Sequence, residues 1–158
     1  MRASAHYRGY QRCSGIDYAD SENVFFLTLC VAPRRAVFVT AECNQVLVGE
    51  IRRLQDEAMW GAYLYCLMTD HIHLVVSPGT EGLPAAVRSL KGRFAAWWRQ
   101  HGDGYPLWQD GYFDHRLRSG ESFTEKCRYV MMNPVRAGLA TQPDQFRWLG
   151  SFAVYTGR

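Results

Sequence analysis

The sequence predicts an α+β fold, a ferredoxin-like (RRM-like) antiparallel sheet with helices packed on one face. Short apolar segments of strand type alternate with amphipathic helical segments in the order β-α-β-β-α-β-α, and a very short turn joins the two adjacent strands. Hydrophobic residues make up 47% of the chain and charged residues 21%, as in ordinary globular domains. With 158 residues, no repeat and no linker, we expect one domain over residues 1–158.

The first strand and the first helix are predicted from an apolar run and a capping signal. Residues 23–31 (NVFFLTLCV) predict a buried strand, because the run is short and contains aromatic and β-branched residues. After a proline break, residues 36–39 are compatible with a short strand or a loop. Thr40 is a suitable N-cap and apolar residues then recur at helical spacing, so we expect a helix that ends by Gly61.

A hairpin and a second helix follow. Residues 62–68 and 71–76 are apolar runs separated by only two residues, which predicts an antiparallel hairpin. Pro84 suits the first turn of a helix, and an apolar stripe with aromatic residues continues at helical spacing. Gly102 and Gly104 are expected to end this helix.

The last predicted elements are a short strand and a capped helix. A strand is expected around residues 112–116. Ser122 and Glu125 form a capping-box pattern, so a helix is expected from there to about Asn133. Pro134 limits its continuation, because the residue before a proline disfavours helical dihedral angles.

Nothing in the sequence suggests secretion or a membrane. No apolar run reaches the roughly 18–20 residues that a membrane span needs. Residues 1–11 lack the apolar segment of a signal peptide. The five cysteines are scattered and form no CxxC pair, so we expect free thiols and a cytoplasmic location without a membrane partner. They are Cys13, Cys30, Cys43, Cys66 and Cys127.

The strongest local signal for chemistry is His71-Ile72-His73 in the second hairpin strand. Side chains two apart on a strand point to the same face, so the two imidazoles can share one divalent metal ion. For an arbitrary His-x-His pair, two half-buried structural histidines are the more common arrangement. Here the strand is otherwise apolar, and unpaired imidazoles would be costly to desolvate, which favours ligands.

A second polar pair lies on the last predicted helix. Tyr129 and Asn133 are four residues apart, so they share one helix face. The phenol of Tyr129 can act as a nucleophile, and the amide oxygen of Asn133 can bind a hard cation. Taken alone, Tyr129 would be interpreted as a tyrosine that packs in the core, and Asn133 as an asparagine that ends the helix. Together with the two histidines they predict a catalytic site.

Three stretches of the chain carry a family resemblance. The segments MTDHIHLVV, LWQDGYFDHRLRS and RYVMMNPVRAGL resemble the REP-associated tyrosine transposases, which belong to the single-tyrosine HUH superfamily. The tyrosine followed four residues later by Asn-Pro-Val-Arg-Ala-Gly is far more specific than the His-x-His triplet. The resemblance covers a core of about residues 24–148 in the right order and spacing.

This resemblance implies a role for each motif residue. His71, His73 and Asn133 would be ligands of Mg²⁺ or Mn²⁺, and Tyr129 would be the nucleophile. The implied activity is metal-dependent cleavage and rejoining (strand transfer) of single-stranded DNA through a 5′-phosphotyrosine, at hairpin-forming repeats. Asp70 departs from the family, which usually has Asn before the first histidine.

Basic residues of the second half are candidates for DNA contact. The net charge is only +3, yet 16 of the 18 basic residues are Arg, whose planar group suits phosphates. A solvent-exposed basic surface is the more ordinary reading for any one of them. The candidates are Arg88, Lys91, Arg93, His115, Arg116, Arg118 and Arg136.

Alternatives to this function remain open on the sequence. A non-catalytic relative could bind single-stranded or hairpin DNA with the same sheet. A nucleotide hydrolase of the histidine-triad kind would need a third alternating histidine, and Val75 stands there. The resemblance leaves two oligomeric states open. One is a monomer whose site is completed in cis, and the other is a homodimer that exchanges its tyrosine helices.

Overall fold

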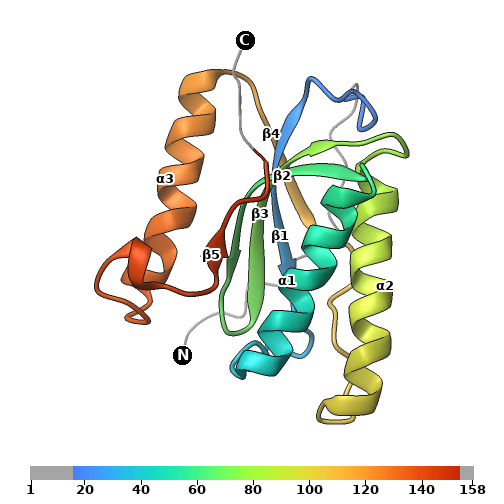
Figure 1. Cartoon of the computed structure of the whole chain (residues 1–158), viewed down its shortest axis with the longest axis vertical. Coiled ribbons are helices and arrows are strands. Elements are labelled where there is room, and N and C mark those ends of the chain that lie inside the picture. The colour runs from blue at the N-terminus through green and yellow to red at the C-terminus, as the bar shows by residue number, and fades with distance from the viewer. Residues whose placement is uncertain (1–15, 154–158) are drawn as a thin grey trace, which may run out of the picture.

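The computed structural model describes residues 16–153, and its elements follow the predicted alternation (Figure 1). The expectation about residues 1–11 concerns a segment outside the described residues. No helix within residues 16–153 has both the length and the apolar character that crossing a membrane requires. The elements are β1 (Val24–Cys30), α1 (Ala41–Asp56), β2 (Trp60–Leu67), β3 (His71–Pro78), α2 (Leu83–His101), β4 (Phe113–Leu117), α3 (Gly120–Arg136), a 3₁₀ turn η1 (Pro143–Gln145) and β5 (Leu149–Gly150).

The strands form one five-stranded antiparallel sheet in the order β4-β1-β3-β2-β5. The predicted α+β class with an antiparallel sheet is therefore confirmed. The hairpin β2–β3 lies inside the sheet, with β1 on the far side of β3 and β4 at the open edge. The two-residue strand β5 was not predicted, because so short a segment carries no periodicity.

Helices cover both faces of the sheet, as Figure 1 shows. The expectation of helices on one face holds for α1 and α2, whereas α3 lies across the opposite face. Alternate residues of β1 explain the difference: Phe25 and Leu27 are buried against α1 and α2, and Val24 and Phe26 are buried on the α3 face. A strand that is apolar on both faces needs a cover on each.

The start of α1 was predicted correctly and its end was not. The hydroxyl of Thr40 accepts a hydrogen bond from the backbone amide of Cys43, as an N-cap does. The helix ends at Asp56, and Gly61 belongs to β2. Ala58, with φ of 56°, turns the chain back toward the sheet before that strand begins. The ambiguous residues 36–39 form a loop rather than a strand.

Helix α3 is longer at both ends than predicted. Its N-cap is Ser119, whose hydroxyl accepts from the amide of Ser122, so the predicted capping box lies within the helix. Pro134 also lies inside, and the helix continues to Arg136. A proline in the last turn removes only one backbone hydrogen bond, which is a modest loss at a helix end. Asn133 is consequently held in helical geometry.

Candidate active site

The two histidines of β3 project together toward α3. In the sheet register His73 is opposite Thr28 of β1 and Cys66 of β2, so the pair lies over the middle of the sheet. Ile72 points the other way and is completely buried against α1 and α2. The period of the strand thus places both imidazoles on the surface that α3 crosses, as the sequence predicted.

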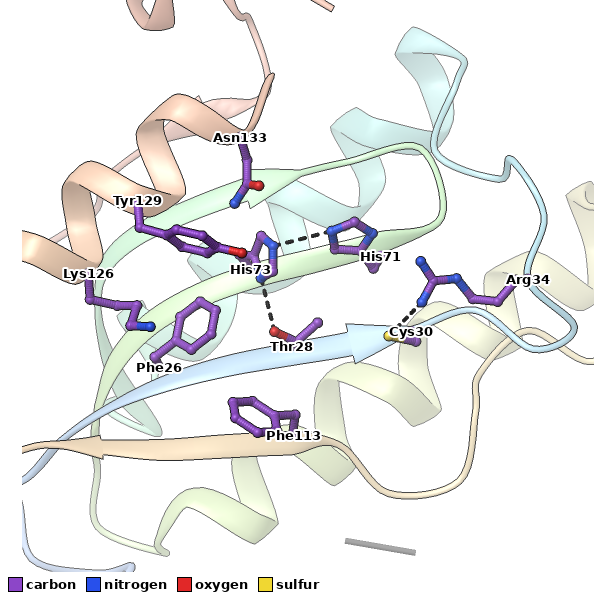
Figure 2. Close-up of a pocket in the computed structure, with 10 residues that line it drawn as sticks. All are labelled: Phe26, Thr28, Cys30, Arg34, His71, His73, Phe113, Lys126, Tyr129 and Asn133. Carbon is purple, nitrogen blue, oxygen red and sulfur yellow. Dashed lines mark hydrogen bonds between the residues drawn. The ribbon is translucent and has the colours of Figure 1, made fainter. Parts of the chain in front are cut away.

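The two imidazoles present their Nε2 atoms to each other at 3.2 Å. Two ligand nitrogens bonded to one cation at about 2.1 Å lie about 3.0–3.4 Å apart, depending on whether the geometry is octahedral or tetrahedral. The opposite ring nitrogens are both held by the protein. Nδ1 of His71 lies 2.6 Å from Oδ1 of Asp70. Nδ1 of His73 lies 3.0 Å from the hydroxyl of Thr28, a contact that Figure 2 marks with a dashed line.

Asp70 orients His71 and is itself held by Arg34. The guanidinium of Arg34 lies 2.9 Å from Oδ2 of Asp70. Burial alone would raise the pKa of Asp70, but hydrogen bonds from His71 and Arg34 outweigh it and lower that pKa. An ionised carboxylate only accepts hydrogen bonds, so Nδ1 of His71 donates, and in the neutral form of the ring the lone pair is then on Nε2. This arrangement is typical of metal-binding histidines.

His73 is neutral at physiological pH in this environment. Its exposed fraction is only 6%. Burial, and then repulsion from a charged His71, lower the pKa of His73 to about 3. A neutral imidazole has a free lone pair, so no proton has to leave His73 before it can bind a cation.

Helix α3 brings Tyr129 and Asn133 over the histidine pair. The ring of Tyr129 lies edge-on to His73, with 6.3 Å between ring centroids, and 46% of the residue is exposed. Figure 2 shows its hydroxyl directed into the pocket toward His73, with Asn133 one turn further along the helix. The two residues share one helix face, as predicted from their spacing.

The side-chain amide of Asn133 has an unsatisfied hydrogen-bonding group. Its Nδ2 atom is buried and has no hydrogen-bond partner among the described residues. Rotation of the amide by half a turn exchanges the nitrogen and oxygen positions, and the two are not distinguished by shape. An oxygen there would lie beside the pocket that the histidine pair also lines, and a cation bound in that pocket would satisfy it.

Histidines, asparagine and tyrosine line a single open pocket of about 470 Å³. Two cations flank the nucleophile candidate. Nζ of Lys126 lies 5.1 Å from the centroid of the Tyr129 ring, and the guanidinium of Arg136 lies 4.7 Å from it and donates to the backbone carbonyl of Tyr129. This charge favours an anionic ligand such as phosphate. The lining residues are Phe26, Thr28, Cys30, Arg34, His71, His73, Phe113, Lys126, Tyr129 and Asn133.

Several of these lining residues were missed in the sequence. Lys126 precedes Tyr129 by three residues and so shares its helix face, and Thr28 is the polar residue of an apolar strand. Either signal could have been used to predict from the sequence that the residue lines the pocket. Arg34 and Phe113 carry no local signal, because each reaches the pocket through contacts distant in the sequence.

Most predicted DNA-contact residues lie away from this pocket. Arg88, Lys91 and Arg93 belong to α2, on the opposite face of the sheet. Nζ of Lys91 donates to the backbone carbonyls of Gln109 and Gly111 at 2.7 and 2.8 Å. Arg93 forms an ion pair with Glu50 at 3.0 Å.

The remaining candidates divide between the two faces. Arg116 alternates with Leu117, which is buried on the α3 face, so its side chain points to the other face and donates to Asn23. His115 is the register partner of Phe26 and is exposed on the pocket face. Arg118 is exposed just beyond β4. Of the predicted DNA-contact residues, His115 and Arg136 lie on the face that carries Tyr129.

The donor set fits a divalent cation with open positions. Within residues 16–153 no cluster of three or more His, Cys, Asp or Glu could hold a metal. A cation at His71 and His73 would need an oxygen ligand of another kind, and the buried amide of Asn133 is placed to supply it. Three protein ligands leave positions for phosphate oxygens or water.

Comparisons with known proteins show the family and the fold of this chain. Residues 23–133 match the family model described as "Transposase IS200 like". The REP-associated tyrosine transposase of Escherichia coli is 22% identical to this chain, over 75% of this chain and 70% of that protein. An uncharacterized protein of Haemophilus influenzae is 19% identical, over 84% of this chain and 91% of that protein.

Two solved structures have a similar fold. A REP-associated tyrosine transposase bound to a REP hairpin matches with a TM-score of 0.72 and 19% identity, over 90% of this chain and 81% of that one. A candidate transposase from Deinococcus radiodurans matches with a TM-score of 0.51 and 20% identity, over 77% and 95% of the two chains. The family match spans well over half of the chain and includes both histidines, Tyr129 and Asn133. The chain belongs to the IS200-like transposase family.

Proposed function

We propose that this protein is a metal-dependent nuclease and strand transferase that cleaves and rejoins single-stranded DNA through a 5′-phosphotyrosine, at hairpin-forming repeats. One observation carries the proposal. The hydroxyl of Tyr129 opens into the pocket where the Nε2 atoms of His71 and His73 converge, and Asn133 lines the same pocket.

His71, His73 and Asn133 would hold the cation. When bound, a divalent ion neutralises charge on the non-bridging oxygens of the phosphate under attack. Two imidazole ligands suit Mn²⁺ better than Mg²⁺, which prefers oxygen, although Mg²⁺ is also a candidate. Asp70 and Thr28 keep the two imidazoles turned toward the shared position.

Tyr129 would attack the phosphorus in line. The bond from phosphorus to the 3′ oxygen breaks as the phenol oxygen bonds to phosphorus. The phenolic proton is transferred to solvent, and the leaving 3′ oxygen takes up a proton from solvent, which gives a free 3′-hydroxyl. Lys126 and Arg136 lie beside the ring and would favour an approaching phosphate. In rejoining, a 3′-hydroxyl attacks the phosphotyrosine and the tyrosine is regenerated.

The DNA partner is supported by one structural neighbour, which was solved bound to a REP hairpin. The complete set of Tyr129, His71, His73 and Asn133 argues against a non-catalytic binder. Val75, buried on the α3 face where a histidine triad would need its third histidine, argues against that hydrolase.

The packing of α3 on the sheet of its own chain brings Tyr129 beside His73, which supports a monomer that acts in cis. Mixing the variants Tyr129→Phe and His73→Ala tests this. Each is expected to remain inactive in the mixture, whereas restored cleavage would show that the tyrosine helix is exchanged in a dimer.

The test of the function is formation of a covalent adduct. Labelled hairpin oligonucleotides from the protein's own genomic flanks are incubated with the purified protein and Mn²⁺ or Mg²⁺. We expect a protein–DNA band that survives denaturation, disappears in excess chelator and is absent for Tyr129→Phe, which retains DNA binding. An adduct of equal yield with the Phe variant would refute the assignment of the nucleophile.

A further inference from the structure

Phe113 is an exposed aromatic residue at the mouth of the active-site pocket. It begins β4, the edge strand on the side of the sheet away from the hairpin, and 37% of it is exposed. Figure 2 shows it on the opposite side of the pocket from Tyr129 and Asn133. Leu117, on the same face of the same strand, is instead buried in the cluster that α3 covers.

The sheet register places Phe113 at a defined distance from the metal-ligand candidates. Phe113 is opposite Thr28, and Thr28 is opposite His73, so the three form one row across neighbouring strands. Strands are spaced about 4.8 Å apart, which puts the backbone of Phe113 about 10 Å from that of His73. One nucleotide with its base turned outward can bridge such a gap.

The aromatic rings between these points form a continuous wall. The ring centroid of Phe26 lies 6.2 Å from that of Phe113 and 6.3 Å from that of Tyr129. Phe26 is only 5% exposed and is also covered by Nζ of Lys126 at 4.6 Å. Of the two phenylalanines, Phe113 is the more exposed, at 37%.

We propose that Phe113 is a base-stacking site, which holds the nucleobase next to the scissile phosphate of a single DNA strand. The site rests on the proposed function and deepens it. Aromatic stacking accepts any base, so Phe113 would provide affinity and position rather than sequence preference. It would hold the strand so that its phosphate lies between Lys126 and the histidine pair.

The setting of Phe113 favours DNA over a protein partner. An exposed aromatic on an edge strand could also pair with a second copy of the chain. Here the ring opens into a pocket that contains Lys126 and Arg34, and exposed His115 follows it on the same face. Cations interleaved with aromatic rings are the usual composition of a surface that binds single strands.

The test compares an oligothymidylate with an oligonucleotide of equal length made only of abasic sites. Binding is measured by fluorescence anisotropy in excess chelator, so that neither cleavage nor a metal ion affects the result. Stacking is worth about 1–3 kcal/mol per base, which is roughly a 5- to 150-fold change in affinity. Phe113→Leu is expected to lose a factor in this range for the oligothymidylate and to bind the abasic strand as before, whereas Phe113→Tyr should retain both affinities.

Tyr105 provides the matched control, because it is an exposed aromatic residue (64%) outside the pocket. Tyr105→Leu should bind both strands as the parent protein does. An equal loss for the two strands in Phe113→Leu, or no loss at all, would overturn the stacking site. The stacking site would also be overturned if sedimentation showed that the loss of affinity comes from dissociation of a dimer.

A second variant keeps the test decisive if Phe113→Leu lowers the melting temperature. Phe113→Trp places a fluorescent ring at the site, and oligothymidylate should add quenching beyond that seen with the parent protein. No added quenching would contradict stacking. These measurements need no covalent adduct, so they can support the stacking site even if the protein does not cleave DNA. Cleavage without stacking at Phe113 would be recognised in the same way.

Discussion

Removing the carboxylate of Asp70 should weaken metal binding without unfolding the protein. Asp70 accepts from Nδ1 of His71 at 2.6 Å, and this contact fixes both the orientation of the ring and the position of its lone pair. In Asp70→Ala the imidazole loses that constraint. Loss of such outer partners costs 10- to 100-fold in metal affinity, so we expect the dissociation constant for Mn²⁺ to rise by about that factor, or about 1.4–2.7 kcal/mol.

Two further variants separate orientation from charge. Asp70→Asn keeps an oxygen that can accept from His71 but loses the negative charge, so its affinity should lie between those of the parent and the alanine variant. Arg34→Met removes the ion pair at 2.9 Å and leaves the contact between Asp70 and His71 in place. Its effect on Mn²⁺ affinity should be the smallest of the three.

The measurement is calorimetric titration of Mn²⁺ without DNA, accompanied by thermal unfolding in chelator. Asp70 lies in the turn between β2 and β3, and its side chain is only partly buried, so the melting temperature should change little. Unchanged Mn²⁺ affinity in a well-folded Asp70→Ala protein would refute the idea that this carboxylate positions His71.

Three other predictions concern the ligands, the core and the thiols. Asn133→Leu should weaken Mn²⁺ binding by roughly 10- to 100-fold while Asn133→Asp retains it, and calorimetry showing equal affinity for Leu and the parent would leave only the histidines as ligands. Ile72→Ala should lower the free energy of unfolding by about 2–5 kcal/mol in urea titration, because Ile72 is fully buried beneath the site; a loss below 1 kcal/mol would contradict that burial. Burial raises the pKa of Cys43 to about 11 and that of Cys66 to about 12, so both thiols are almost entirely protonated at pH 8. Iodoacetamide at pH 8 should label them only after unfolding, as mass spectrometry can check.

Much of the fold could be predicted because its signals are local. Two apolar runs separated by two residues can hardly form anything but the hairpin β2–β3, and Thr40 begins α1 as expected. The boundaries that failed depend on competition between neighbouring signals. Ser119 takes the capping position ahead of Ser122, and Pro134 is tolerated because it falls in the last turn of α3.

The sequence by itself determined which side chains share a face within one element. A period of two puts His71 and His73 together, and a period of 3.6 residues does the same for Tyr129 and Asn133. These relations depend only on backbone geometry, which repeats along the chain. They identified the four residues of the candidate site.

Only the tertiary structure decided that these two faces meet. The α3 helix crosses the sheet face opposite α1 and α2 because β1 is apolar on both sides, and this brings Tyr129 to His73. The same packing places Arg34 and Phe113 at the pocket and leaves Lys91 on the other side of the sheet. Such contacts join residues far apart in the chain, so they follow from the burial of whole elements, which no local spacing encodes.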